Sequence, residues 1–195
     1  MINILHLFFL KLKFRKKIKI GKNIKLSIFV KINITEQGLL VIEDNSIIKS
    51  DVEIRVHKNA KVFLNKNIKL DNGVRIIASN NATVNIGDRT KIGYFTVINA
   101  GDSLSIGRNC LISGFVYLQT SMHKHRQGMN IQDQGFDHSP IIMGDDVWLG
   151  THVVIMPGIK ILNGSIVGSN SVVTKNIDKN TIVAGIPATY LKTRT

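Results

Sequence analysis

The sequence predicts an all-β chain wound into a column of about seven triangular coils, each 18 residues long. The first observation is a ladder of 21 apolar residues at steps of six, in a chain that is only 44% hydrophobic. The second is a further set of small or β-branched residues, four positions after the ladder residues on two sides of each coil. The third is that extra residues always enter at one corner. The ladder positions are Ile20, Leu26, Ile32, Ile42, Ile48, Ile54, Leu64, Leu70, Ile76, Ile86, Ile92, Ile98, Ile106, Ile112, Leu118, Met143, Leu149, Ile155, Ile161, Val167 and Val173.

The further set lies four positions after the ladder residues. On two sides of each coil these residues are small or β-branched, as a narrow parallel interior requires. On the third side Glu36, Lys58 and Asn80 take that place, so we expect irregular corners there. The inward corner positions of the two regular sides are Ile24, Val30, Ser46, Val52, Ile68, Val74, Thr90, Thr96, Cys110, Val116, Val147, Val153, Ser165 and Ser171.

Extra residues enter only between the third side of one coil and the first side of the next. Four follow each of the first three coils, two follow the fourth, and nineteen, residues 124–142, follow the fifth. The short inserts end in an apolar residue two positions before the next coil, as at Leu40 before Ile42, which lengthens one strand per coil. The long insert is then a loop on a rigid scaffold, where function concentrates.

The basic charge gathers at the N-terminus. The net charge is +13, and nine cations precede the first acidic residue, Glu36. Residues 11–20 largely alternate charged and apolar side chains, which predicts a strand with cations on one face. Residues 1–10 are almost wholly apolar but too few to span a bilayer, and cations that follow the apolar run do not fit a signal peptide. We expect residues 1–19 to cap the first coil.

The alternative for the basic region is contact of residues 1–31 with anionic lipid or an anionic polysaccharide. Nucleic acid is not an expected partner, because no groove-reading motif or run of aromatic residues accompanies the charge. The single cysteine, Cys110, falls at an inward corner and has no partner for an intrachain disulfide. We therefore expect a cytoplasmic protein, free or peripheral to the inner face of the membrane.

Pairs such as Ile86-Gly87, Ile106-Gly107 and Leu149-Gly150 resemble the repeats of the hexapeptide-repeat acyltransferases. The resemblance covers residues 20 to about 190, and residues 142–191, with GDDVWLGTHVVIMPGIKI and VAGIPATYLK, are similar to the sugar and xenobiotic acetyltransferases of that group. It implies a left-handed parallel β-helix, a homotrimer and acetyl-CoA as the acyl donor. The handedness is implied by the resemblance alone, since parallel crossovers ordinarily have the opposite hand.

Two histidines stand at the start of the long insert. A histidine side chain titrates near neutral pH, so it can accept a proton from a hydroxyl and return it to a leaving thiolate. The resemblance implies His123 as this general base, with direct attack of a substrate hydroxyl on the thioester and no covalent acyl-enzyme. His125 is the alternative base. The remaining interpretation is that both are solvated loop residues.

Trp148 occupies an outward strand position, so its ring is expected to be exposed. The resemblance implies that it acts beside the catalytic histidine, whereas the alternative is packing at a subunit interface or under the long insert. The resemblance also implies acetyl-CoA contacts, with Thr189 standing where many relatives carry arginine. The expected acetyl-CoA residues are Thr151, Ser169, Thr174, Lys175, Gly185 and Lys192.

A metal is not expected. Related β-helices include zinc enzymes with three shared histidines, but the spacing of His138 and His152 does not reproduce their pattern. His152 is expected at a subunit interface.

The sequence therefore predicts an acetyl-CoA-dependent O-acetyltransferase that modifies a sugar of a capsule, a sialic-acid polymer, an O-antigen or a precursor. Its parts are a cap at residues 1–19, the β-helix at 20–178 with its insert, and a C-terminal tail at 179–195 that completes the CoA site. The alternatives are an N-acetyltransferase of an amino sugar nucleotide, a small-molecule O-acetyltransferase, and a non-catalytic binding scaffold.

Overall fold

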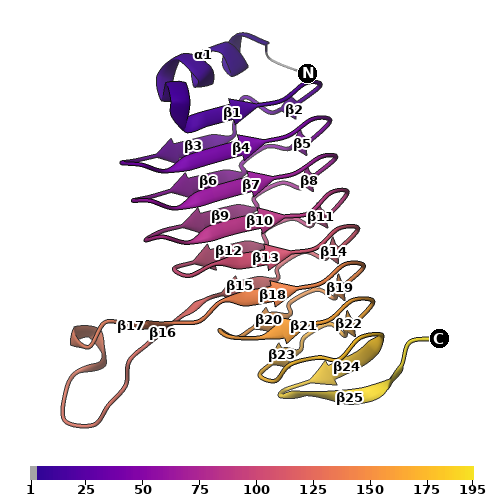
Figure 1. Ribbon diagram of the computed structural model, residues 1–195. Helices are drawn as coiled ribbons and strands as arrows, with labels where there is room; N and C mark the ends of the chain where they lie inside the picture. The colour runs from indigo at the N-terminus through magenta and orange to yellow at the C-terminus, as the bar shows by residue number, and fades with distance from the viewer. Residues whose placement is uncertain (1–3) are drawn as a thin grey trace.

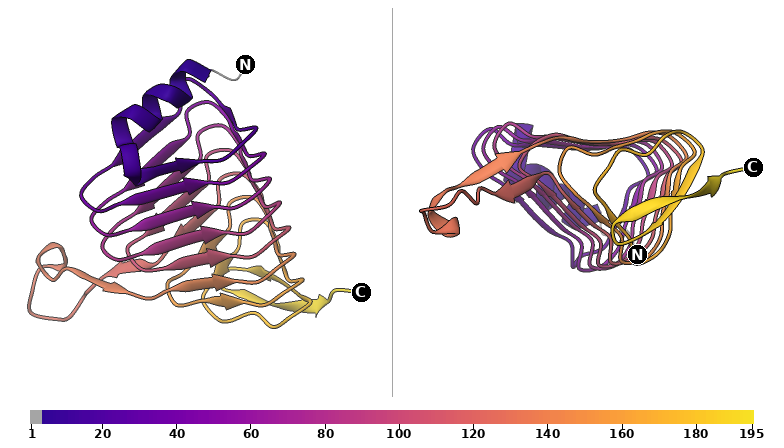
Figure 2. Two further views of the ribbon diagram at one scale, coloured as in Figure 1. Left: turned by 45° about the horizontal axis from the view of Figure 1, so that its top comes forward. Right: turned by 90° about the horizontal axis from the view of Figure 1, so that it is seen from below.

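The computed structural model describes residues 4–195, so the first three residues of the expected cap lie outside the described part. Three parallel sheets form the sides of a triangular column (Figure 1). Viewed from the C-terminal end, the chain turns clockwise as it approaches the viewer, which is the left-handed sense (Figure 2). The predicted left-handed parallel β-helix of about seven coils is confirmed.

Each sheet collects one side of successive coils. Sheet 1 contains β1 (Ile18–Ile20), β4 (Leu39–Ile42), β7 (Lys61–Leu64), β10 (Thr83–Ile86), β13 (Leu104–Ile106), β18 (Ile141–Met143) and β21 (Lys160–Ile161). Sheet 2 contains β2 (Lys25–Leu26), β5 (Ile47–Ile48), β8 (Lys69–Leu70), β11 (Lys91–Ile92), β14 (Leu111–Ile112), β19 (Trp148–Leu149), β22 (Ile166–Val167), β24 (Thr181–Gly185) and β25 (Ala188–Thr193). Sheet 3 contains β3 (Lys31–Ile34), β6 (Glu53–Val56), β9 (Arg75–Ala78), β12 (Val97–Ala100), β15 (Tyr117–Gln119), β20 (Val154–Ile155) and β23 (Val172–Val173).

The ladder fills the column. Every ladder residue is buried except Ile20, which is partly buried against the core at the first coil. Strand pairing keeps the ladder in register, as where Ile42 of β4 lies opposite Leu64 of β7. The inward corner residues are buried as well, including the polar Ser46 and Thr90, whose hydroxyls donate to backbone carbonyls. A satisfied hydroxyl costs little to bury, so serine and threonine serve at these tight corners.

The corners require a left-handed backbone at non-glycine residues. Asn45, Asn67 and Asn109 have φ values near +60°, which asparagine tolerates better than most residues. The same conformation occurs at two exposed phenylalanines, Phe95 (φ +54°) and Phe115 (φ +59°). These rings stack on one another at 5.5 Å along the edge between sheets 2 and 3. The third side differs from the other two, as expected: its left-handed residues Glu36, Lys58 and Asn80 come four positions after the ladder residue instead of three, and none of them is buried.

Ion pairs on sheet 3 join neighbouring coils. A carboxylate oxygen of Glu53 in β6 accepts from Arg75 of β9 at 2.8 Å, and the other accepts from Arg55 at 2.7 Å. Partial burial raises the pKa of Glu53, but the hydrogen bonds and charges of the two arginines outweigh burial and hold that pKa below its usual range.

The N-terminal region differs from the prediction. Residues 11–20 do not form one strand: α1 (Ile4–Phe14) and η1 (Arg15–Lys17) precede β1, which starts only at Ile18. The physical reason is that the apolar residues also fit helical spacing, with Leu10 and Phe14 four apart and both buried in the core. α1 lies across the N-terminal end of the column (Figure 1). No helix in the described part of the chain is long and apolar enough to cross a bilayer.

The long insert, expected at residues 124–142, begins and ends at other residues. It leaves the column at β16 (Ser121–His123) and returns through β17 (Phe136–His138), with η2 (Ile131–Asp133) near the tip. His123 therefore belongs to the insert and does not close the fifth coil. At the other boundary, Ile141 is buried opposite Leu104, so residues 141 and 142 belong to β18 of the column. We call residues 121–138 the arm.

The C-terminal residues form an antiparallel hairpin of β24 and β25 beside the last coil. Its turn contains Gly185, whose φ of +105° suits glycine best. The hairpin is tied to the sixth coil by Arg194, which donates to a carboxylate oxygen of Asp146 at 2.8 Å.

Candidate functional site

The arm is a two-stranded hairpin that projects from the edge between sheets 3 and 1 (Figures 1 and 2). Its antiparallel register places Ser121 opposite His138 and His123 opposite Phe136. The buried Thr120 anchors its base, because its Oγ1 accepts from the backbone N–H of Asp102 at 2.9 Å and donates to the carbonyl of that residue at 3.2 Å. The arm thus starts from a fixed point of the rigid column.

The two histidines expected as bases lie on or beside β16, exposed to solvent. The ring of His123 packs on Phe136 of the opposite strand, with ring centroids 4.1 Å apart. His125 lies beyond the strand, and its Nδ1 is 3.1 Å from the carbonyl oxygen of His123. Phe136 thus fixes one face of the His123 ring while the side chain remains accessible to a substrate.

A third histidine, His138, lies at the base of the arm. Its Nδ1 and the Oγ of Ser121 are 2.8 Å apart, in hydrogen-bond contact. A β-carbon at Gly101 would collide with both atoms, so the glycine leaves room for the pair. Sequence reasoning considered His138 only as a metal ligand, because nothing in its spacing reveals which residue faces it across the hairpin. A serine hydroxyl beside an imidazole can transfer a proton, so His138 is a further candidate base.

The tip of the arm is held by one side-chain amide. Gln134 Oε1 accepts from the backbone N–H of Arg126 at 2.7 Å, and its Nε2 donates to the carbonyls of Arg126 and Met129 at 2.9 and 3.0 Å. An ion pair at 3.8 Å joins Lys124, directly after β16, to Asp137 of β17. These contacts give the arm a defined shape although most of its residues are exposed.

The arm carries several exposed apolar side chains. Met129 and Ile131 are more than half exposed, and Met122 and Phe136 are exposed to a lesser degree. Four exposed apolar side chains do not stabilise a hairpin that stands free in water. They would be buried if the arm packed against another surface, so they indicate such a contact.

Trp148 lies on a different side of the column from the arm. It belongs to β19 of sheet 2, it is 49% exposed, and its Nε1 donates to Ser113 Oγ at 3.3 Å. The expected exposure is confirmed. Packing under the arm of the same chain is excluded, since the arm leaves the column between sheets 3 and 1. Within one chain, therefore, His123 and Trp148 do not meet.

The expected acetyl-CoA residues fall into separate groups. Thr174 and Lys175 follow β23, the last strand of sheet 3, and therefore lie on the same edge of the column as the arm. Two coils separate them from the arm, which is about 10 Å along the column axis. Both residues line a cavity of about 400 Å³, together with Thr189 and other residues of the C-terminal hairpin.

Thr151 and Ser169 lie on another edge, between sheets 2 and 3. The Thr151 hydroxyl donates to the Gly114 carbonyl at 2.9 Å, so it is already used within the chain. Lys192 is exposed on β25, and Gly185 stands in the turn of the hairpin. Within one chain, therefore, Thr174 and Lys175 lie on the same edge as the arm, whereas the other residues expected to contact acetyl-CoA do not. The acetyl-CoA contacts of all six residues stay predictions.

Cys110 does not supply a nucleophile. Burial raises the pKa of the Cys110 thiol, which also donates to the carbonyl of Gly144 at 3.2 Å. A protonated, enclosed thiol does not attack a thioester. Among residues 4–195, no three His, Cys, Asp or Glu side chains gather closely enough to hold a metal ion. His152 instead stacks on Phe115 at 4.9 Å.

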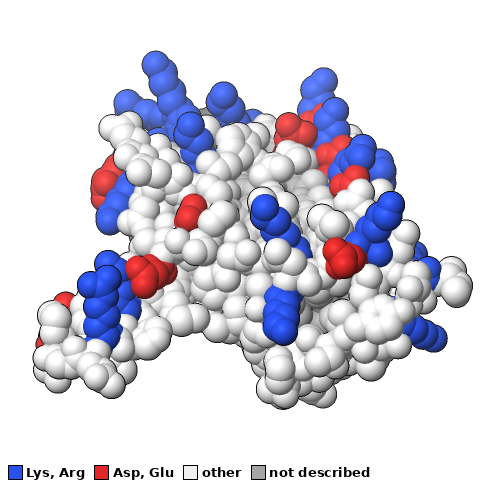
Figure 3. Space-filling view, turned by 60° about the horizontal axis from the view of Figure 1, so that its bottom comes forward, with Lys and Arg blue, Asp and Glu red and all other residues white. Residues whose placement is uncertain are grey.

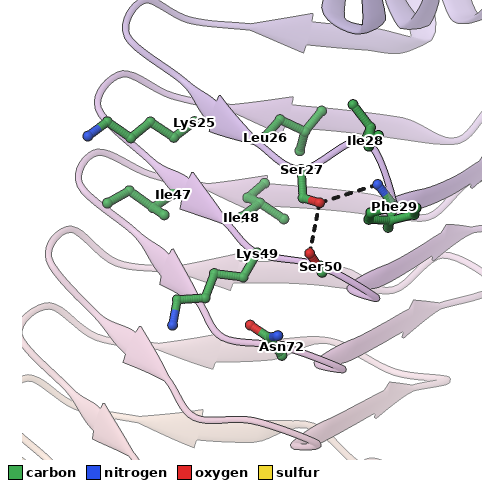
Figure 4. Close-up of a pocket in the computed structure, with 10 residues that line it drawn as sticks. All are labelled: Lys25, Leu26, Ser27, Ile28, Phe29, Ile47, Ile48, Lys49, Ser50 and Asn72. Atoms are coloured by element: carbon green, nitrogen blue, oxygen red, sulfur yellow. Dashed lines mark hydrogen bonds between the residues drawn. The ribbon is translucent and has the colours of Figure 1, made fainter. Parts of the chain in front are cut away.

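A cavity of about 680 Å³ lies far from the arm, on the first three coils (Figure 4). It is lined mainly by apolar residues such as Ile28, Phe29 and Ile47, with Ser27 Oγ and Ser50 Oγ 2.9 Å apart at one side. Its lining contains no histidine, aspartate or glutamate. Its only titratable side chains are Lys25 and Lys49, and Lys49 is paired with Asp71 at 2.9 Å, so this cavity is not the candidate catalytic site.

Comparison with known proteins shows what the chain is similar to. The model of the family described as bacterial transferase hexapeptide (six repeats) matches residues 140–175. The putative lipopolysaccharide biosynthesis O-acetyl transferase WbbJ of Escherichia coli (strain K12) is 30% identical over 145 residues, which cover 70% of this chain and 74% of WbbJ.

Two solved structures extend the comparison. The polySia-specific acetyltransferase NeuO is 25% identical with a TM-score of 0.54, covering 91% of this chain and 85% of NeuO. The hexapeptide-repeat acetyltransferase VCA0836 of Vibrio cholerae O1 biovar eltor, solved with acetyl-CoA, is 29% identical with a TM-score of 0.59, covering 71% of each chain.

Proposed function

Because this chain belongs to the hexapeptide-repeat sugar acetyltransferases and is an acyltransferase, we propose that it transfers an acetyl group from acetyl-CoA to a hydroxyl of a surface polysaccharide or its precursor. One observation carries the proposal: the single large projection of the column bears His123 in an exposed, ring-packed position, on the edge that also carries Thr174 and Lys175. The acetyl-CoA complex of VCA0836 supports the choice of donor.

In the proposed reaction the imidazole of His123 accepts the proton of the attacking hydroxyl. The hydroxyl oxygen forms a bond to the thioester carbonyl carbon, and the resulting oxyanion is stabilised by a backbone N–H. When the carbon–sulfur bond breaks, the imidazolium returns its proton to the leaving thiolate. The proposed transfer is direct and uses no acyl-enzyme: Cys110 is enclosed, and the hydrogen-bonded Ser121–His138 pair takes no part in the proposed step.

We further propose that the complete site lies between subunits of a homotrimer. His123 and Trp148 lie on different sides of one column, so a site that uses both needs two chains. The exposed apolar side chains of the arm are the surface that a neighbouring chain would bury. Thr151, Ser169 and Lys192 would then bind acetyl-CoA from the neighbouring chain.

The acceptor is proposed to be a sugar hydroxyl in the cytoplasm, where acetyl-CoA is made. NeuO is specific for polysialic acid and WbbJ is named for lipopolysaccharide biosynthesis, which favours a glycan polymer or its precursor over a small molecule.

The test is a thiol-release assay with acetyl-CoA against a panel of acceptors. The panel contains polysialic acid, O-antigen and capsule oligosaccharides, an amino sugar nucleotide and chloramphenicol. We expect turnover with one or more glycans and an acetyl ester in the product. An amide product from the amino sugar nucleotide, turnover with chloramphenicol alone, or no turnover with any acceptor would contradict the proposal.

A further inference from the structure

Helix α1 buries one apolar face and exposes another. Leu10 and Phe14 are buried against the first coils. The other face carries four apolar side chains spaced as one helical stripe, each 58–63% exposed. A helix that is apolar all round is normally enclosed, so this open stripe indicates a further contact. Its residues are Leu5, Phe8, Phe9 and Leu12.

Unpaired cations surround this stripe. Lys11 and Lys13 flank it on the helix, and Arg15, Lys16 and Lys19 follow directly. Within the described residues, none of the nine cations from position 11 to position 31 forms an ion pair, whereas seven of the 17 cations that follow are paired with an acid. In the space-filling view, which turns the C-terminal end forward, blue side chains project along the upper rim, where the N-terminal end lies (Figure 3).

The first coil adds apolar and basic groups at the same end. Ile28 and Phe29 are 51% and 61% exposed at the edge between sheets 2 and 3, and Lys25 points outward at the opposite end of this segment (Figure 4). A second cavity, of about 660 Å³, lies where α1 runs into the first coil. It is lined by Lys13, Phe14, Arg15, Lys16, Lys17, Asn33 and Ile34.

We propose that the N-terminal end of the column binds an anionic lipid surface. The open stripe of α1 enters the boundary between headgroups and acyl chains, as interfacial helices do. The lysines at its rim contact lipid phosphates, with their aliphatic stems along the apolar surface. An anionic polysaccharide would satisfy the charges but would leave Phe8 and Phe9 in water, so the exposed apolar stripe favours lipid. The helix lies across the end of the column, so the column would stand away from the membrane.

The experiment is vesicle co-sedimentation of the full chain. One set of vesicles contains phosphatidylcholine alone and the other phosphatidylcholine with phosphatidylglycerol. One variant replaces four exposed cations of the end, Lys11, Lys13, Lys16 and Lys19, by glutamine. Its matched control replaces four exposed lysines of the column by glutamine, namely Lys66, Lys91, Lys160 and Lys179. A third variant, Phe8→Ser with Phe9→Ser, tests the apolar stripe without changing charge.

We expect binding to the anionic vesicles only. The N-terminal lysine variant should lose roughly a thousandfold in partitioning, the Phe8/Phe9 variant at least about tenfold, and the column variant almost nothing. Equal binding to both vesicle types, no binding, or an equal loss in the column variant would overturn the proposal. A Phe8/Phe9 variant that binds like the parent chain would also overturn it. That result would mean that the apolar stripe makes no contact with lipid and that the basic residues serve to bind a soluble polyanion. Vesicle binding is measured without acetyl-CoA, so the outcome is independent of the proposed reaction.

Discussion

Phe115 offers a quantitative test of how the corners are stabilised. Its backbone is left-handed, with φ of +59°, yet its ring is only 42% exposed because it is stacked between neighbours. Phe95 lies at 5.5 Å, His152 at 4.9 Å, and Tyr94 meets the ring edge-on at 5.2 Å. The informative changes are Phe115→Ala, which removes the ring, and Phe115→Gly, which removes the ring and the backbone strain.

The expected free energies of unfolding follow from these contacts. Three ring contacts at about 0.5–1.5 kcal/mol each give a loss of about 2 kcal/mol for Phe115→Ala after allowance for the exposure of the ring. Phe115→Gly loses the same contacts but relieves a left-handed backbone that costs about 1–2 kcal/mol. The greater freedom of glycine in the unfolded chain offsets about 0.4–1 kcal/mol of that gain. The glycine variant should therefore be more stable than the alanine variant by about 0.5–1 kcal/mol.

The assay is urea unfolding followed by circular dichroism, with Phe63 as the matched position. Phe63 lies in β7, where the backbone is extended, so there Phe63→Gly should be less stable than Phe63→Ala by about 0.5–1 kcal/mol. The order of the two variants is thus expected to reverse between positions 115 and 63. The same order at both positions, or an alanine variant at 115 as stable as the parent chain, would refute the reasoning.

Three further outcomes are expected. Mixing two inactive variants, His123→Gln and Trp148→Ala, should restore activity at up to about a quarter of the sites in randomly assembled trimers, whereas a site within one chain would stay inactive. Glu53→Gln should cost about 1 kcal/mol at pH 7. The pKa of Glu53 is lowered in the folded chain, so its contribution is present above the unfolded-state pKa and is lost as pH falls through the folded value. Urea unfolding at several pH values should show the difference between parent and Glu53→Gln vanishing in acid, and a difference that grows in acid would be contrary to this account. Gln134→Ala removes the three hydrogen bonds of the arm tip and should raise the rate of proteolytic cleavage within the arm with little change in the thermal midpoint; unchanged cleavage would show that the amide does not hold the tip.

The column could be predicted because each ladder residue stacks on its equivalent in the next coil. A six-residue period leaves a single way to bury Ile42, Leu64 and Ile86 together. The helix α1 could not be predicted with the same certainty, since Lys11, Leu12, Lys13 and Phe14 alternate and also fit a helix. Only contact with the column decides between the two, by burying Phe14 together with Leu10.

The site was predicted less completely than the fold. His123 could be picked out because it stands where the column is interrupted. The Ser121–His138 contact could not, because the register of a hairpin depends on the conformation of its turn, which the sequence of the arm does not specify. The separation of Trp148 from His123 was likewise hidden, since it depends on which sheet each residue belongs to.

The most direct test of the proposed chemistry is the turnover number for thiol release in His123→Gln, measured beside His125→Gln and His138→Gln. The account predicts that kcat falls at least about a hundredfold in His123→Gln, with the dissociation constant for acetyl-CoA unchanged, while the other two variants stay within about tenfold of the parent chain. Full turnover in His123→Gln, or a loss confined to His138→Gln, would contradict it.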